Sequence, residues 1–284
     1  MKSLKEYIYE GLLDRVKNKE VNHEAIIKDF LEANYKFSGS YTIKATNKGF
    51  TIDAEDDVRV INKDITSLTN EFFEFGAIVG CFSCENCKSL QYLKGAPKEV
   101  KLEFNCAGCN SLKTLEGAPQ KAGSFDCSNC KSLQSLKGTP QKVGGFICAY
   151  CDSLKTLEGV PKEVGESFDC KWCNSLTSLK GAPKEVDGDF CCSDCNSLKT
   201  LEGAPQKVDF FICSENPSLI DVKDAPKKCD IFNCEKCVSL KDLSGVKTVY
   251  IHCMGCGKNF NGKYLVNTTG AKYKVGLTGR ETKL

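Results

Sequence analysis

Hydrophobic positions repeat along most of the chain with a period of 21 or 22 residues. A typical copy contains a phenylalanine, a cysteine two residues later, a second cysteine three residues further on, and two leucines three residues apart. The copies begin at Phe82, Phe104, Phe125, Phe146, Phe168, Phe190, Phe211 and Phe232, and a shorter ninth copy begins near Ile251. A regular repeat of this length predicts a solenoid, in which each copy forms one coil and stacks on its neighbours.

Within each copy the pattern predicts one short strand, a turn and a return arm. In Phe-x-Cys, alternate residues point to opposite faces, so phenylalanine and the first cysteine are expected to face the core. The following Leu-x-x-Leu predicts a turn that buries both leucines. The return arm, Leu-x-Gly-Ala-Pro, is too short and too rich in glycine and proline for an α-helix. We therefore expect irregular outer arms.

The segments that flank the repeats predict caps. Residues 4–34 carry apolar side chains at helical spacing. The pattern of residues 41–61 predicts strands on either side of a turn at Gly49. The next segment resembles a degenerate coil, with Asn62 at the place of the first cysteine. The expected divisions are a helical segment at 1–36, a strand-rich cap and degenerate coil at 37–80, the cysteine-containing repeats at 81–256, and a C-terminal cap with a basic tail at 257–284.

The repeat resembles the leucine-rich repeat, L-x-x-L-x-L-x-x-(N/C)-x-x-L, at its short bacterial length. In the fourth copy the five consensus places hold Val143, Phe146, Cys148, Cys151 and Leu154. The resemblance covers about residues 58–256 and implies a mainly β, right-handed solenoid of about nine coils with a small α/β N-terminal cap. Phenylalanine at the central leucine place and cysteine at the second strand place depart from the family pattern.

Composition changes this picture through one residue type, cysteine. The chain has 284 residues and 20 cysteines, and its 39 basic and 37 acidic residues give a formal charge of +2. This balance provides no broad basic surface for nucleic acid or an anionic membrane. The sequence contains no apolar run long enough to span a membrane and no secretory signal. We therefore expect a protein of a reducing cytosol, where cysteines are thiols, metal ligands or catalytic groups.

The paired cysteines allow two interpretations. Cys106-x-x-Cys109, followed after 17 residues by Cys127-x-x-Cys130, fits the spacing of a four-cysteine zinc site. The other interpretation is a core of stacked thiols, in which the second cysteine takes the Asn/Cys place that bonds the turn backbone in the resembled family. Asn216 replaces the second cysteine in the seventh copy, and asparagine replaces such a group better than it replaces a thiolate. We expect thiols and no cofactor, with zinc as the alternative.

The repeat places at which the residue type varies from copy to copy indicate where a partner binds. Tyr150 and Trp172, the one tryptophan of the chain, follow the first cysteine in neighbouring copies, so they are expected about one strand spacing (~4.8 Å) apart. An exposed aromatic patch with a polar rim is typical of a binding hot spot, although aromatic residues are also common on strand surfaces. Cys191 is expected to face outward as a reactive thiol. The candidate partner-binding residues are Trp172, Tyr150, Asp169, Asp126, Ile147, Phe210, Ile212 and Asp189.

The sequence shows no catalytic constellation. Its two histidines, His23 and His252, are far apart, and it has no nucleophile elbow, phosphate loop or H-E-x-x-H motif. The first eleven residues resemble the capsid-targeting leader of internal head proteins in large tailed phages, with Glu10 and Gly11 at the cleavage place, and they also fit an ordinary amphipathic helix. The phrase S-L-x-x-L-x-G-A-P-x-x-V resembles repeat proteins encoded by gut bacteriophages.

Together these patterns predict a monomeric, non-enzymatic scaffold that binds a protein and neither nucleic acid nor a membrane. We expect it to be phage-encoded, and to act in the cytoplasm of a bacterial host cell or inside a virion. The partner is expected to be a host or virion protein. The alternatives are a zinc- or redox-active cysteine-pair protein and a structural or internal virion protein.

Overall fold

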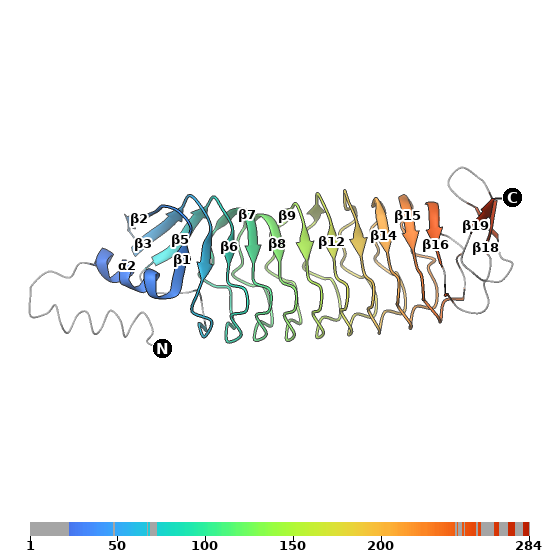
Figure 1. Ribbon diagram of the computed structural model, residues 1–284, viewed down its shortest axis with the longest axis horizontal. Coiled ribbons are helices and arrows are strands. Elements are labelled where there is room, and N and C mark those ends of the chain that lie inside the picture. Colours follow the sequence, from blue (N-terminus) through green and yellow to red (C-terminus); the bar gives the residue numbers. More distant parts are fainter. Residues whose placement is uncertain are drawn as a thin grey trace, which may run out of the picture.

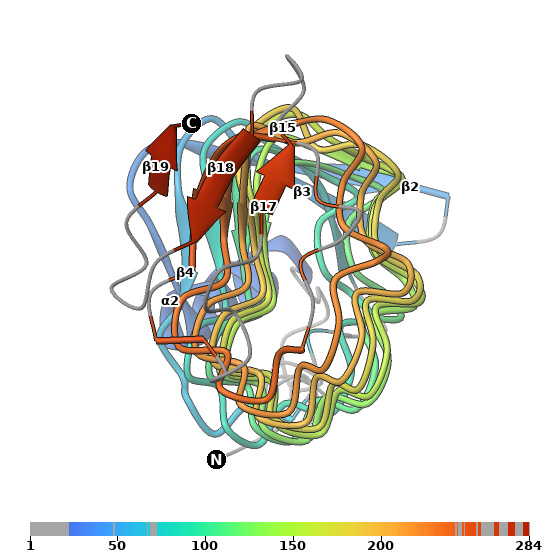
Figure 2. The same ribbon diagram turned by 90° about the vertical axis from the view of Figure 1, so that its right-hand side faces the viewer.

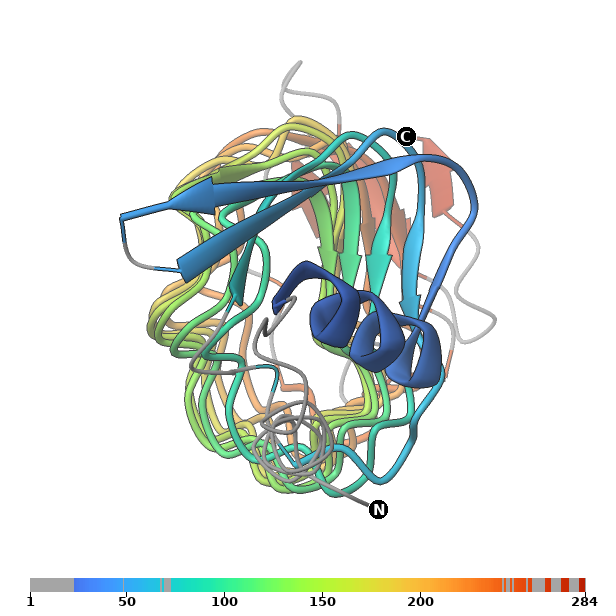
Figure 3. The same cartoon turned by 90° about the vertical axis from the view of Figure 1, so that its left-hand side faces the viewer.

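The computed structural model is a long stack of coils with a short helix at one end (Figure 1). It describes residues 23–47, 49–66, 68, 73–241, 243, 246, 248–253 and 255–256, together with strands at 264–266, 272–275 and 281–283. Helix α2 spans His23–Asn34 and buries Ile27 and Leu31 against the end of the stack, which it covers in Figure 3. The helix expected over residues 4–34 is therefore confirmed from His23 onward, and its earlier part lies outside the described residues.

Short strands make up the rest of the described structure. Those at the N-terminal end are β1 (Tyr35–Phe37), β2 (Tyr41–Thr46), β3 (Gly49–Ala54), β4 (Val58–Val60) and β5 (Phe73–Ile78). Those of the coils are β6 (Phe82–Ser83), β7 (Glu99–Asn105), β8 (Lys121–Asp126), β9 (Lys142–Val143), β10 (Phe146–Ile147), β11 (Glu163–Val164), β12 (Phe168–Asp169), β13 (Phe190–Cys191), β14 (Phe210–Ile212), β15 (Cys229–Asn233) and β16 (Thr248–His252). A separate antiparallel sheet contains β17 (Tyr264–Val266), β18 (Lys272–Val275) and β19 (Glu281–Lys283).

One parallel sheet runs along the stack in the order of the chain, from β6 through β7, β8, β10 and β12 to β16. The register places phenylalanine opposite phenylalanine, as Phe146 opposite Phe168 and Phe168 opposite Phe190. Viewed end-on, the coils superimpose (Figure 2). The chain is therefore mainly β and forms a parallel β-solenoid of about nine turns, as the repeat predicted. We number its coils 1 to 9 from the copies that begin at Phe82 to Ile251.

Stacked phenylalanine rings form the centre of the coils. The repeat phenylalanines from Phe82 to Phe232 are almost completely buried. Ring centroids of neighbouring coils lie between 4.9 Å, for Phe168 and Phe190, and 5.8 Å, for Phe82 and Phe104. Because each ring packs between two others, truncating one to alanine should cost about 3–5 kcal/mol.

The outer arms contain no helix among the described residues of the coils, as their composition predicted. Val143 in β9 pairs with Val164 in β11, and an isolated bridge joins Val164 to Val186. Tight bends separate these arms from the leucines. At one such bend Gly159 has a φ of 98°, and a Cβ there would lie 2.6 Å from the backbone nitrogen of Lys137. Elsewhere in the described chain, no helix has the length and apolar character of a membrane span.

Candidate functional site

Cysteine thiols link each coil to the one before it. In the second cysteine column, Cys109 Sγ lies 3.1 Å from the carbonyl oxygen of Cys84, and Cys130 Sγ lies 3.3 Å from that of Cys106. The same donation to the preceding coil recurs at Cys151, Cys173, Cys195, Cys237 and Cys256. We call this column of donors the thiol ladder. It adds a hydrogen bond to buried carbonyl groups, of which those of Cys84 and Cys106 also accept one from a backbone N–H of their own coil.

Asn216 occupies the ladder place in coil 7. Its Nδ2 donates to the carbonyl oxygens of Cys192, at 3.0 Å, and Cys213, at 2.9 Å. Its Oδ1 accepts a hydrogen bond from the backbone N–H of Cys195, at 2.7 Å. An amide therefore makes the contact that a thiol makes in the other coils and adds two more. This equivalence supports the sequence interpretation of the second cysteine as a backbone-bonding group.

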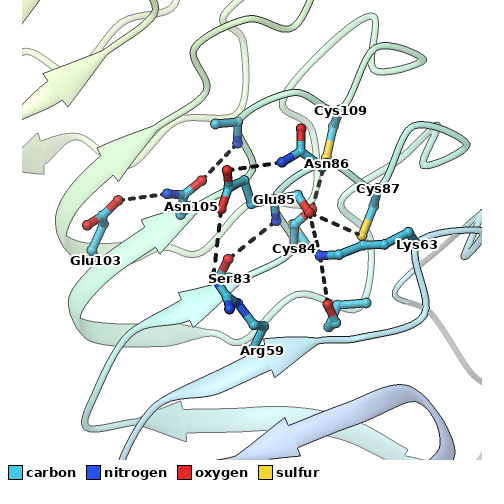
Figure 4. A network of polar contacts seen from close by, with 12 residues as sticks. Arg59, Lys63, Ser83, Cys84, Glu85, Asn86, Cys87, Glu103, Asn105 and Cys109 are labelled. Carbon is cyan, nitrogen blue, oxygen red and sulfur yellow. Dashed lines mark hydrogen bonds and ion pairs between the residues drawn. The ribbon is translucent and has the colours of Figure 1, made fainter.

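Lys63 begins the ladder at the N-terminal end (Figure 4). Its ammonium group donates to the carbonyl oxygens of Val60, at 2.9 Å, and Glu85, at 2.6 Å. The register of β4 on β6 pairs Arg59 with Ser83. The next residue, Val60, therefore stands opposite the first cysteine of coil 1. Lys63 therefore donates to the carbonyl group of Val60, which is equivalent to the carbonyl group that accepts a hydrogen bond from a ladder thiol in the later coils.

The expectation that Asn62 takes a first-cysteine place is wrong. Val60 takes that place because Val58 and Val60 alternate on the strand and are both buried, which fixes the register. Asn62 lies beyond the strand, where its Nδ2 donates to Asn34 Oδ1 at 2.7 Å. It therefore joins the first turn of the stack to the end of α2, and the comparison with the cysteines rests on Asn216 alone.

The pKa of most thiols in the two cysteine columns is raised, whereas hydrogen bonding with Cys84 and Cys234 lowers the pKa of Cys109 and Cys256, respectively. Desolvation raises the pKa of Cys106, Cys127 and Cys192 well above the ordinary value of a thiol. It also raises the pKa of Cys87 and Cys237 to about 12. Zinc is bound by thiolates, and the described residues include no group of three or more His, Cys, Asp or Glu side chains placed to hold a metal ion. Hydrogen bonding and packing account for the paired cysteines.

Tyr150 and Trp172 stack on the surface of coils 4 and 5. Their ring centroids are 5.9 Å apart and their planes differ by 4°. The two residues are 40% and 38% exposed. Lys131 Nζ lies 5.9 Å from the centroid of the Tyr150 ring and 2.8 Å from Asp152 Oδ2. The pair is therefore a half-exposed aromatic stack with a cation over the tyrosine ring.

The backbone beneath this pair differs from the sequence expectation. We expected Tyr150 and Trp172 on the strand surface, but they lie in the tight turn after the strand, with φ values of 60° and 59°. Of the other seven coils, four carry asparagine or glycine at this left-handed place and three carry Asp194, Glu215 or Lys236. Asparagine and glycine adopt this conformation readily, whereas a bulky side chain does so at a cost. Coils 4 and 5 thus accept local strain and expose aromatic rings.

Asp126 and Asp169 have a structural role at the same turn. Asp126 Oδ1 accepts a hydrogen bond from the N–H of Ser128 at 2.8 Å, and Asp169 Oδ1 accepts one from Lys171 at 2.9 Å. Asn105 and Asn233 form the same cap in their coils. These are the local bonds that aspartate and asparagine make in turns. Ile147 in coil 4 cannot form this cap and is 39% exposed, so it extends the apolar surface.

Phe210 and Ile212 form a second cluster, in coils 7 to 9, apart from the aromatic pair. Phe210 pairs with Ile231, and Ile231 with Tyr250, along one column of the sheet. Tyr250 is 59% exposed. The sequence analysis missed Ile231 and Tyr250, although both occupy the same repeat place as Phe210, directly before the core residue of the strand. The candidate residues therefore belong to two clusters.

Asp189 and Asp194 are half-buried in coil 6, between the two clusters. Burial and the neighbouring carboxylate of Asp209 raise the pKa of Asp189, and burial and Glu215 raise that of Asp194. Each therefore faces a like charge on the next coil. Asp189 also accepts a hydrogen bond from the backbone of Phe210, on the next coil, rather than from its own turn.

Cys191 lies in the outward column but lacks the environment of a reactive thiol. It is half-buried, and its Sγ lies 3.7 Å from Ser193 Oγ. Burial raises its pKa, whereas reactive cysteines have a lowered pKa in electropositive surroundings. The outward position is thus confirmed, whereas the reactivity of this half-buried thiol stays a prediction.

The remaining sequence candidates lie elsewhere. His23 in α2 and His252 in β16 stand at opposite ends of the stack, so they share no site. Glu10 and Gly11 lie outside the described residues. Comparisons with protein-family models, curated proteins and solved structures gave no match.

Proposed function

We propose that this chain is a non-enzymatic protein-binding scaffold whose strand face presents Tyr150 and Trp172 to a protein partner. The stacked, exposed pair in left-handed backbone conformations carries the proposal. Other coils carry asparagine, glycine, Asp194, Glu215 or Lys236 at this place, so neither the turn nor the core requires two large aromatic rings there. Aromatic side chains with a polar surround supply much of the binding energy at protein interfaces.

A rigid scaffold supports this surface. The phenylalanine stack and the thiol ladder fix each coil against the next, so the pair is held in place before binding and little ordering is needed. We further propose that the solenoid is right-handed and of the leucine-rich-repeat type. The ladder supports this assignment, because a side chain at the Asn/Cys place donates to the backbone in each coil from Cys109 to Cys256. Parallel crossovers are right-handed in nearly all proteins.

Capture with matched variants tests the scaffold. The full chain is used as bait in a bacterial lysate, the captured protein is identified and purified, and its affinity is measured. Tyr150→Asn with Trp172→Asn should lower that affinity at least a hundredfold, because the surface is removed while the turn keeps a favoured residue. Tyr92→Asn, at a residue that is 61% exposed outside the strand face, should leave it unchanged. Equal affinity for all three proteins would contradict the proposal.

The biological setting is a separate proposal. The resemblance of the N-terminal segment and of the repeat phrase to phage proteins supports a phage-encoded chain, acting in a bacterial host cell or carried in a virion. Mass spectrometry of the chain purified from infected cells and from particles tests this setting. A mature protein that begins at Gly11 would support virion packaging, whereas an intact N-terminus in both samples would contradict it.

A further inference from the structure

A shallow pocket opens on the strand face of coil 4, beside Ile147. Ile147 contributes apolar surface, and Gly145 and the almost completely buried Phe125 also line the pocket. Ser124, Ser167 and three carboxylates, those of Glu103, Asp126 and Glu166, complete the lining, which includes no lysine or arginine. The pocket therefore combines an apolar floor with a negatively charged rim.

Gly145 keeps this pocket open. It lies directly before the core phenylalanine of its coil, at the place where other coils carry Asp189, Phe210 or Tyr250. A Cβ at Gly145 would meet nothing closer than Glu166 Oε2 at 3.6 Å, so a side chain would fit there. Its φ is not positive, and the backbone does not require glycine. Together with the small side chains of Ser124 and Ser167 at the same place in the adjacent coils, Gly145 leaves space on this face.

The rim carboxylates keep acceptor capacity for a partner. Glu103 accepts a hydrogen bond from the amide of Asn105 at 3.1 Å, and Asp126 uses one oxygen for the turn cap. Neither contact involves a positive charge. Three carboxylates around an apolar floor concentrate negative potential where the local dielectric is low. An arginine side chain matches both parts, because its methylene stem packs on apolar surface and its planar guanidinium pairs with carboxylates.

The pocket and the aromatic pair lie along one coil. Gly145 and Tyr150 are five residues apart, which limits their separation to roughly 17 Å. An extended peptide could therefore reach both with two side chains no more than about five residues apart. Ile147 lies between them and would contact the segment that joins those side chains.

We propose that the pocket at Gly145 receives an arginine side chain of the protein partner, while Tyr150 and Trp172 pack against an apolar or aromatic residue within five positions of it. This inference rests on the proposed function and specifies the chemistry of its partner. The match is one of charge and shape. A negatively charged rim selects a cation, the narrow apolar floor selects a long side chain, and the ring surface selects a flat or apolar neighbour.

Fluorescence anisotropy with a defined peptide tests the proposal. The probe is the fluorescein-labelled, end-blocked peptide Ser-Gly-Arg-Ser-Gly-Ser-Phe-Gly-Ser-Gly, titrated with the full chain. Its matched control replaces arginine with citrulline, which has nearly the same shape and no charge. The arginine peptide should bind, and the citrulline peptide should bind at least tenfold more weakly. Equal binding of the two peptides, or no binding of the arginine peptide at millimolar protein, would overturn the inference.

Protein variants locate the binding site. Glu103→Gln with Glu166→Gln should weaken arginine-peptide binding at least tenfold, and Gly145→Phe, which copies the native Phe210 of the same column, should abolish it. Glu116→Gln with Glu158→Gln makes the same charge change on exposed outer arms and should alter binding less than twofold. Unchanged binding by Gly145→Phe, with its unfolding midpoint retained, would overturn the inference. One outcome is that the pocket variants still bind the captured partner while the aromatic variants do not. That result would support the proposed function and overturn the proposal that the pocket receives an arginine.

Discussion

The indole ring of Trp172 lies parallel to the phenol ring of Tyr150 on the preceding coil, at a centroid distance of 5.9 Å. Both residues occupy a left-handed turn position that favours asparagine or glycine. A stack of this kind gains about 0.5–1.5 kcal/mol, and each left-handed backbone costs about 1–2 kcal/mol. Folding therefore gains little or nothing from the pair.

Replacing both rings should leave the fold intact. In the variant Tyr150→Asn with Trp172→Asn, relief of two left-handed positions offsets the lost stack, so the free energy of unfolding should stay within about 1 kcal/mol of the parent or rise. Urea unfolding monitored by circular dichroism measures this value. A loss of several kcal/mol would show that the rings serve the stability of the fold.

The ladder place in coil 7 should depend on hydrogen bonding. Asn216→Ala removes three buried hydrogen bonds, to Cys192, Cys213 and Cys195, and should cost about 3 kcal/mol or more. Asn216→Cys restores the single donor used by other coils and should cost less. Urea unfolding of both variants measures the difference, and equal losses would show that volume rather than hydrogen bonding determines stability there.

The folded chain should become unstable in alkali. Thiols of the unfolded chain titrate near pH 9, whereas burial raises the pKa of Cys87 and Cys237 to about 12. Between these values the folded state binds more protons, so the free energy of unfolding is greatest below pH 9 and falls as the pH rises. Each thiol whose pKa is raised in this way should contribute about 1 kcal/mol to this fall over the first pH unit above 9. Urea unfolding at pH 8, 9 and 10 checks the slope, and a flat profile would contradict it.

Thiol titration distinguishes the ladder from a zinc site. Denatured, reduced protein should contain 20 titratable thiols and no stoichiometric metal. In the native state most should resist brief treatment with iodoacetamide at neutral pH, since burial raises their pKa. Chelation should leave the unfolding midpoint unchanged. Stoichiometric zinc, lost together with folding on chelation, would overturn the ladder interpretation.

Two glycines provide a matched test of the coil backbone. Gly159→Ala places a Cβ 2.6 Å from the backbone nitrogen of Lys137 and forces a positive φ on alanine, so it should cost at least about 1–2 kcal/mol. Gly165→Ala, where the nearest atom lies 3.8 Å away and φ is not positive, should have little effect. The difference in free energy of unfolding between the variants measures the constraint, and similar values would contradict it.

The sequence predicted the coils because their core is strictly periodic. Phe146, Cys148, Cys151 and Leu154 have counterparts in equivalent places, and the buried face of the strand repeats from copy to copy. The caps formed by Asp126 and the strained turn at Tyr150 could not be predicted, because they depend on backbone angles that side-chain periodicity does not specify. The pocket at Gly145 was missed for a related reason, since its walls come from several coils. The predicted place of Asn62 was wrong because the repeat is irregular in this part of the chain, so residue spacing alone does not determine the register of the strand.

The direction of the ladder determines how the molecule responds to tension. Ladder and sheet hydrogen bonds run along the long axis of the stack, so a pull on its two ends would open them one coil at a time. Each coil occupies about 4.8 Å of that axis and, once released, could extend to about 70 Å. The solenoid would therefore lengthen in discrete steps under tension, and the coils that are still stacked would keep their shape.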